Sequence, residues 1–263
     1  MTHLAAASSI HVTLGEVAAA LALVAIAAIA SRAWHAELEE DIGIAVFRSL
    51  VQLTAIGYVI TLIFDQDSAV LVLALITVMV VFGAFTARNR AKCVPNAFWP
   101  LLIALAVAAA ATLGLVIALG IFPATPRYLV PVGGMVIGNS MTSAAVALNR
   151  LGEDVHDQSR TIEATLALGA TSSQAVTPLV QRSLRSGMIT LVDSTKTTGL
   201  IFFPGTMVGM LLAGANPTDA VRLQLILLYV LLGAASIAAL MAITLARRNF
   251  FTSAHQLREP PEP

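Results

Sequence analysis

The chain is poor in charged and aromatic residues. Only 11% of its 263 residues are charged and 6% are aromatic, and its 15 basic residues cancel its 15 acidic ones. Soluble domains carry about 25% charged residues, so this composition excludes an ordinary soluble domain. The zero net charge supplies no field that would attract nucleic acid. A hydrophobic share of 57% and a mean hydropathy of +0.85 predict a polytopic membrane protein instead.

Cysteine and lysine are also scarce. Cys93 is the single cysteine, so an internal disulfide is excluded, and no Cys/His spacing resembles a zinc site. The two lysines, Lys92 and Lys196, do not follow glycine, which excludes the Gly-Lys-Ser/Thr of a phosphate-binding loop. The apolar runs contain no paired carboxylates, no Ser/His set and no histidines at metal-ligand spacing. The sequence therefore does not predict an enzyme embedded in the membrane. We expect no cofactor in this chain, and any ATP and magnesium would act on a partner.

Long apolar runs predict an all-α bundle of about seven transmembrane helices. A helix needs about 20 apolar residues to cross a bilayer, and the run at 12–31 reaches this length, so we read it as a retained helix rather than a cleaved signal. We expect one transmembrane domain over 1–249 and a disordered, proline-rich tail over 250–263. The expected spans are 12–31, 43–64, 69–87, 98–120, 129–149, 187–213 and 219–246.

Basic residues predict the orientation in the inner (plasma) membrane. Lys and Arg are retained on the cytoplasmic side of short loops, and here they follow the first, third, fifth and last spans. Only Arg127 and Arg222 fall on the opposite side. The N-terminus is therefore expected outside and the C-terminus in the cytoplasm. The cations that share one side are Arg32, Arg88, Arg90, Lys92, Arg150, Arg160, Arg182, Arg185, Arg247, Arg248 and Arg258.

A long polar interval, about 152–186, is predicted to fold as a helical cytoplasmic loop. A short amphipathic helix is expected from Asp157 to Leu168, with Asp157 or Ser159 capping its start and Gly169 closing it in the left-handed conformation. The sequence Thr171-Ser172-Ser173-Gln174 then fits a capping box that starts a second helix. Two helices should therefore meet at a glycine turn.

Ionisable groups inside spans are costly and are candidates for function. Asp193 and Lys196 are one helical turn apart in the predicted sixth span and could pair. Arg48 and Gln52 lie at a similar predicted depth in the second span, where they could meet Asp193. The cluster is either a packing lock or part of the translocation path. Its sum of plus one for Arg48, Asp193 and Lys196 disfavours a bare cation.

Glycine pairs and one proline mark the predicted fifth and sixth spans. Gly134 with Gly138, and Gly205 with Gly209, have the spacing that lets helices approach closely in lipid. Pro204 is expected to kink the sixth span.

A polar position with soft neighbours lies in the fifth span. Asn139 is flanked by Met135 and Met141, whose thioethers prefer soft metals, whereas its amide and the carboxylate of Asp193 suit harder ions. A metal site on these residues is a weaker hypothesis than ordinary packing.

The polar loop resembles the coupling loop of ABC-transporter permeases, with Glu-Ala-Ala, three residues, Gly, nine residues and an apolar position. Here Glu163-Ala164-Thr165 precedes Gly169, and Leu179 follows after nine more residues; Thr165 departs from the pattern. This resemblance implies that Glu163, Ala164, Leu168, Gly169 and Ala170 couple the chain to an ATPase.

Three longer runs resemble the FetB family of ABC permeases, which includes bacterial iron-export permeases and related plant permeases linked to aluminium tolerance. The runs are "VPVGGMVIGNSMTSAAVALNRL", "IEATLALGAT" and "LVDSTKTTGLIFFPGTMVGMLLAG". The resemblance implies a permease subunit that exports iron or another metal, working as two copies with two ATPase subunits of the FetA type. Two alternatives stay open: export of a small anionic or sugar-nucleotide-like solute, and a secondary transporter without an ATPase.

Overall fold

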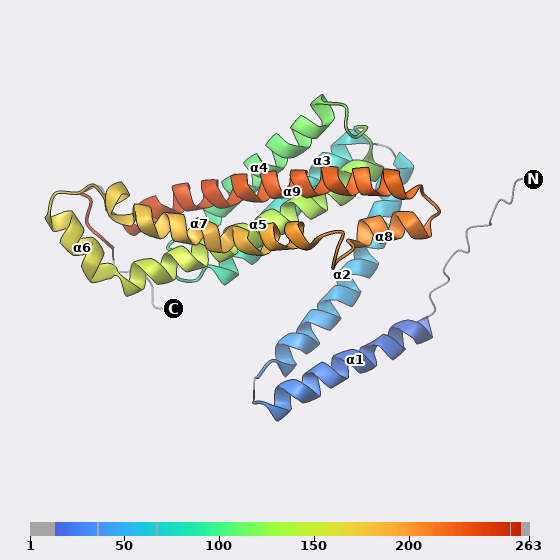
Figure 1. Cartoon of the computed structure of the whole chain (residues 1–263), viewed down its shortest axis with the longest axis horizontal. Helices are drawn as coiled ribbons and strands as arrows, with labels where there is room; N and C mark the ends of the chain where they lie inside the picture. The colour runs from blue at the N-terminus through green and yellow to red at the C-terminus, as the bar shows by residue number, and fades with distance from the viewer. Residues whose placement is uncertain (1–13, 36, 67, 253, 259–263) are drawn as a thin grey trace, which may run out of the picture. The chain divides into compact units, whose positions relative to one another are not determined.

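The computed structural model describes residues 14–35, 37–66, 68–252 and 254–258, and the regular elements among them are helices, with no strand (Figure 1). The predicted all-α polytopic fold is confirmed. Six helices in the described residues are long and apolar enough to cross a membrane. They are α1 (Leu14–Ala33), α2 (Glu39–Gln66), α3 (Ala69–Arg90), α4 (Phe98–Ala118), α5 (Pro126–Asp157) and α9 (Pro217–Ala246).

The remaining helices are α6 (Ser159–Ala167), α7 (Ser172–Thr197), α8 (Gly205–Leu212) and the 3-10 turn η1 (Arg247–Phe250). Together α7 and α8 replace the single span predicted over 187–213. The helix stops at Thr197, and Gly199 takes a φ of 90°. Pro204 directly precedes α8, so the predicted kink at Pro204 is wrong: the proline borders a break in the helix.

The described chain forms two compact units. One contains α1 and α2 together with residues 212–214, and the other contains the rest of the bundle. In the first unit the α1–α2 connection is held by a hydrogen bond from the Leu38 backbone N–H to Ser31 Oγ, 3.0 Å long. The single domain expected over 1–249 stays a prediction.

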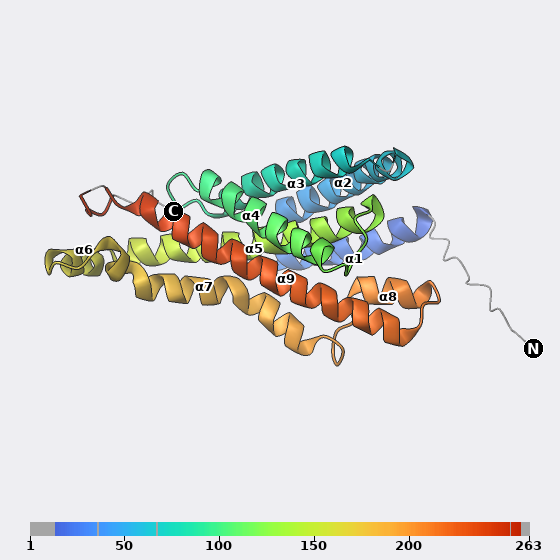
Figure 2. The ribbon, with the colours of Figure 1, turned by 90° about the horizontal axis from the view of Figure 1, so that it is seen from above.

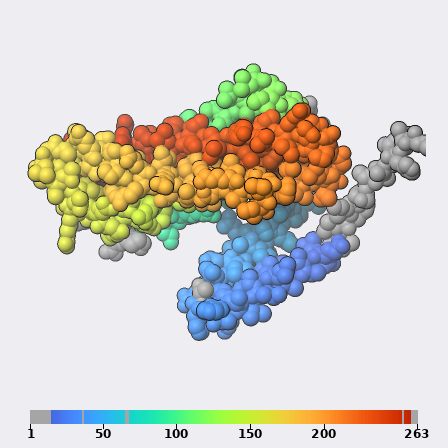
Figure 3. Space-filling model, viewed as in Figure 1, coloured from blue at the N-terminus to red at the C-terminus, as the bar shows by residue number. Residues whose placement is uncertain are grey.

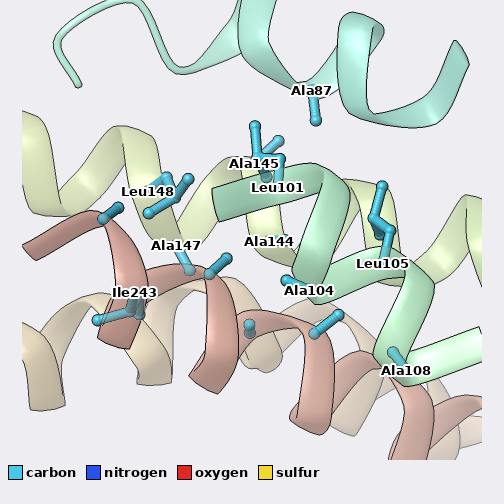
Figure 4. Packing of buried hydrophobic residues seen from close by; sticks show 14 of the residues in the cluster. Ala87, Leu101, Ala104, Leu105, Ala108, Ala144, Ala145, Ala147, Leu148 and Ile243 are labelled. Carbon is cyan, nitrogen blue, oxygen red and sulfur yellow. The ribbon is translucent and has the colours of Figure 1, made fainter. Parts of the chain in front are cut away.

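In the second unit, α5 packs against α3, α4, α7 and α9. Figure 4 shows how alanines allow these helices to approach one another, with Ala104 and Ala108 of α4 and Ala144 and Ala147 of α5 fully buried. Small residues at helix contacts are what association in lipid requires, because apolar side chains gain little by leaving lipid tails. α5, α7 and α9 thus each pack against the other two and run alongside one another (Figure 2).

The C-terminal residues fold back as a strap, defined here as residues 247–252 and 254–258. Phe250 and Phe251 are buried, and the Arg258 backbone N–H donates to the Phe250 carbonyl at 2.8 Å. Asn249 Nδ2 donates to the Pro95 carbonyl at 2.9 Å. The expectation of a disordered tail from residue 250 is therefore wrong as far as Arg258, because two phenylalanines anchor it; residues 259–263 lie outside the described residues.

Candidate functional site

The elbow, defined as residues 159–180, joins α6 to the start of α7 at one end of the second unit (Figures 1 and 3). The turn that ends α6 has two hydrogen bonds: Gly169 N–H donates to the Leu166 carbonyl at 2.9 Å, and Ala170 N–H donates to the Thr165 carbonyl at 3.3 Å. This pair is the Schellman arrangement, which needs a left-handed residue between helix and exit. Gly169 supplies it with a φ of 94°, as predicted.

The start of α7 is closed as well. Thr171 Oγ1 accepts from the Gln174 backbone N–H at 3.3 Å, and Gln174 Oε1 accepts from the Thr171 backbone N–H at 2.9 Å. The predicted capping box is confirmed. The predicted cap of α6 by Asp157 or Ser159 is wrong, because α6 starts after Gln158 without a side-chain cap.

One face of the elbow is buried against the bundle, and the other face is exposed in the single chain. Ile162, Val176 and Leu179 are buried against the bundle. All but one of the predicted coupling residues are exposed, and Leu168 is 89% exposed; Ala170 is half-buried. The exposed ones are Glu163, Ala164, Leu168 and Gly169.

The strap and α5 brace the elbow. Arg247 Nη1 donates to Ser173 Oγ at 3.1 Å, and Ser172 Oγ lies 3.0 Å from His255 Nδ1. Arg182 Nη2 donates to Gln158 Oε1 at 3.3 Å. The first two bonds tie the start of α7 to the strap, and the third ties a later turn of α7 to the end of α5.

Sequence reasoning missed a buried carboxylate beside the elbow. Asp154, on the last turn of α5, is 3% exposed and pairs through Oδ1 with Arg150 Nη2 at 3.0 Å. Its Oδ2 is buried without a hydrogen-bond partner among the described residues. The i, i+4 spacing of Arg150 and Asp154 was the available signal, since such pairs share one helix face.

The polar candidates on α7 come together as predicted. Lys196 Nζ lies 3.0 Å from Asp193 Oδ1, and both side chains are exposed in the single chain. Nearby hydroxyls bond to their own helix; Thr195 Oγ1, for example, donates to the Leu191 carbonyl at 2.7 Å. Arg48 and Gln52 lie on α2, in the other unit, so their approach to Asp193 stays a prediction.

The end of α7 lies at membrane depth if the predicted cytoplasmic boundary is near Arg150. Gly187 is level with Ser143–Ala147 of α5, because a Cβ there would lie 2.6 Å from the Ser143 carbonyl oxygen. Thr197 lies ten residues further along α7, which is about 15 Å at 1.5 Å per residue. The break in residues 198–204 therefore falls roughly 20 Å from the level of Arg150, within a hydrocarbon core of about 30 Å.

The remaining candidates on α5 lie in local contacts. Asn139 Nδ2 donates to the Met135 carbonyl of its own helix at 2.9 Å, and Met135 and Met141 are partly buried against the core. No group of three or more His, Cys, Asp or Glu side chains in the described residues could hold a metal ion.

The glycine pairs differ from expectation. A Cβ at Gly134 would meet Met79 Cε at 3.3 Å, while Gly138, Gly205 and Gly209 have nothing within 4 Å. The tight approaches occur instead at Gly152, against Cys93, and at Gly187, against α5.

The fold therefore defines a multi-pass helical membrane protein with an elbow beyond its spans and a charged pair on a broken helix. Residues 14–251 match the family described as "Uncharacterised protein family (UPF0014)", and the chain belongs to this family.

Named relatives cover nearly the whole chain. It is 36% identical over 250 residues to "Probable iron export permease protein FetB" of Escherichia coli (strain K12), covering 95% of this chain and 96% of the relative. It is 39% identical over 241 residues to "UPF0014 membrane protein STAR2" of Oryza sativa subsp. japonica (92% and 85%). It is 37% identical over 241 residues to "Protein ALUMINUM SENSITIVE 3" of Arabidopsis thaliana (92% and 88%). No solved structure matches the chain significantly.

Proposed function

We propose that this protein is the membrane subunit of an ATP-binding-cassette transporter and that its elbow docks on a separate ATPase subunit. The observation that carries the proposal is Leu168, an apolar side chain 89% exposed at the tip of a rigidly closed helical turn. Exposed Ala164 and Ala167 lie one helical turn or less from Leu168, so the three side chains form one apolar patch on a polar loop. A contiguous exposed apolar patch marks a protein contact. ATP and magnesium would bind the ATPase, in a complex of two permeases and two ATPases.

The shape of α6 supports a close contact. Ala164 and Ala167 are exposed beside Leu168, and Glu163 lies on the same open side. Small side chains let a partner's surface reach the backbone, while the buried Ile162 fixes the helix from below. The partner would therefore meet a firm, shallow surface with one projecting leucine.

The break after α7 supports a place on the translocation path. Non-helical backbone at membrane depth is tolerated only where protein or a water-filled cavity covers it, and interrupted helices mark binding sites in many transporters. In the single chain Leu200 and Ile201 are more than 80% exposed, at 88% and 82%. A second copy of the chain would cover this segment, with Asp193 and Lys196 facing the path.

The proposed cargo is iron or another metal, moved outward, as the name of the bacterial relative suggests. Lys196 neutralises Asp193 at 3.0 Å, so the pair offers no net negative charge to a bare cation. This favours a chelated or anionic form of the metal. The same neutral pair also suits a small anionic solute, which is the second candidate.

The coupling role is tested by Leu168→Glu in the chain co-expressed with the proposed FetA-type ATPase subunit. Ile121→Glu is the matched control, because Ile121 is an exposed apolar residue in the loop between α4 and α5. We expect Leu168→Glu to lower co-purification and stimulated ATP hydrolysis at least about tenfold, which corresponds to roughly 1.4 kcal/mol. The control should leave both unchanged. Full assembly and hydrolysis with Leu168→Glu would contradict the proposal.

A further inference from the structure

The loop between α3 and α4 contains a hollow of about 590 Å³ that the proposed function does not use. Arg88 and Lys92 line it, together with Asn89, Asn96 and Trp99. Within the described part of the chain, no acidic side chain lines this hollow. Its chemistry is therefore that of an anion site with an aromatic edge.

The hollow is preformed because the loop is clamped from behind. Ala91, Cys93 and Ala97 are at most 5% exposed, and the Pro95 carbonyl accepts the bond from Asn249 of the strap. Burial raises the pKa of the Cys93 thiol, and the nearby Glu153 carboxylate raises it further. A preformed site is favourable, since little loop ordering is needed when a ligand binds.

Gly152 makes this clamp possible. A Cβ on Gly152 would lie 2.7 Å from the Cys93 Cβ and 3.0 Å from its carbonyl oxygen. Only glycine lets α5 reach the loop this closely. The cations on the outer side of the loop are thus held in place by contacts on its inner side.

The hollow borders apolar surface. Trp99 and Ile103 of α4 are 64% and 44% exposed and lie one turn apart, and Phe85 of α3 is 51% exposed. The loop lies at the same end of its unit as the strap (Figure 2), which is the predicted cytoplasmic edge of the membrane. Tryptophan is enriched at such interfaces. A ligand that fits both parts carries a negative headgroup and an apolar chain.

We propose that this hollow binds the phosphate headgroup of an anionic phospholipid. Arg88 and Lys92 supply the positive charge, Asn89 and Asn96 supply N–H donors, and Trp99 contacts the upper part of the acyl chains. Basic pockets between helices on the cytoplasmic side are suited to such headgroups. The hollow is separate from the elbow and from the α7 break. The lipid proposal therefore stands whether or not an ATPase docks on the elbow.

The test uses the fluorescence of Trp99 in the full chain. The sequence has two tryptophans, so Trp34→Phe leaves Trp99 as the only one. The protein is reconstituted in phosphatidylcholine vesicles that contain phosphatidylglycerol, with bromine on the acyl chains of one lipid or the other. We expect brominated phosphatidylglycerol to quench Trp99 more strongly than brominated phosphatidylcholine at equal mole fraction.

The charge-removal variant is Arg88→Gln with Lys92→Gln. Each basic residue near an anionic surface contributes about 1 kcal/mol, so the pair should weaken the preference for phosphatidylglycerol roughly thirty-fold. The matched control is Arg160→Gln with Arg258→Gln, two exposed cations outside the hollow. Should the double variant fold poorly, Lys92→Gln alone should give about a five-fold loss, and Arg88→Lys with Lys92→Arg should keep the preference.

Four results would overturn the proposal. Equal quenching of Trp99 by the two brominated lipids would show that the hollow does not prefer the anionic lipid. An equal loss in the control pair would show general attraction to the surface. Displacement of the lipid by soluble glycerol phosphate would show that the hollow takes phosphate from solution, and release of the lipid by the ATPase alone would assign the hollow to a protein contact.

Discussion

The two halves of α7 are held very differently. In the first half Val176, Leu179, Ser183 and Gly187 are buried, and caps and the strap fix its start. From 188 to 203 no residue is buried, although Asp193 and Lys196 lie in this stretch. One continuous helix therefore connects a clamped, elbow-bearing half to a loosely contacted half that ends in a break.

The difference indicates how a signal could travel. Few buried contacts allow a segment to shift at low cost, while a helix transmits displacement along its axis. We infer that movement of the elbow would reach Asp193 through α7 itself. The predictions below on Gly187, on Asp193 with Lys196 and on Thr171 each alter one half and leave the other intact, and Gly138→Ala on α5 serves as their reference.

The largest effect is expected from Gly187→Ala, at the inner limit of the clamped half. The new methyl would lie 2.6 Å from the Ser143 carbonyl oxygen and 2.7 Å from the Ala147 Cβ. Overpacking of this kind costs about 1–3 kcal/mol, and we expect the upper end because backbone is involved. A thiol-reactive dye measures unfolding through the buried Cys93; an unchanged midpoint would refute the close α5–α7 contact.

A smaller effect, on transport alone, is expected from Asp193→Asn with Lys196→Gln in the loose half. Removing both charges leaves no unpaired ion, so stability should hold. If the pair faces the path, flux of cargo should fall about tenfold, the change expected for roughly 1.4 kcal/mol of barrier. Normal flux in vesicles would rule out an essential charge at this position.

The contrast between the halves also separates what sequence could predict from what it could not. The capping box, Gly169 and the Asp193–Lys196 pair follow local rules of spacing, and the structure confirms them. The break at 198–204 was missed because its apolar residues match a continuous span. The tight contact of Gly187 depends on α5, which is distant in sequence.

The same reasoning explains the error at the strap and the open glycine positions, whose predicted role in close helix packing stays a prediction. Burial of Phe250 and Phe251 depends on where α9 ends against the bundle, which composition does not reveal. The Gly138, Gly205 and Gly209 motifs exist in the sequence, but no side chain approaches them within this chain. Spacing predicts that a contact is possible and does not identify the partner.

A modest loss of stability is expected from Thr171→Ala at the start of the clamped half. Loss of a threonine N-cap costs about 1 kcal/mol, and the Schellman turn before it stays intact. Thermal unfolding in detergent measures this, with Thr161→Ala as the control because Thr161 is exposed on α6. Equal midpoints for the two variants would show that the capping box does not stabilise the elbow.

The smallest effect is expected from Gly138→Ala, the glycine counterpart of Gly187→Ala. Nothing lies within 4 Å of the position in one chain. The free energy of unfolding should therefore change by less than about 0.5 kcal/mol. If Gly138 contacts a second copy, self-association measured in detergent would weaken while the monomer remains stable. A large loss of monomer stability would contradict the described packing of α5.

The most direct measurement is metal efflux from proteoliposomes that contain the chain with or without the proposed ATPase subunit. The proposed function predicts efflux only when both subunits are present and ATP is inside the vesicles. It also predicts that Leu168→Glu abolishes this efflux and that Ile121→Glu does not. Efflux that runs on an ion gradient without the ATPase, or that is unaffected by Leu168→Glu, would contradict the claim that the elbow couples this permease to ATP hydrolysis.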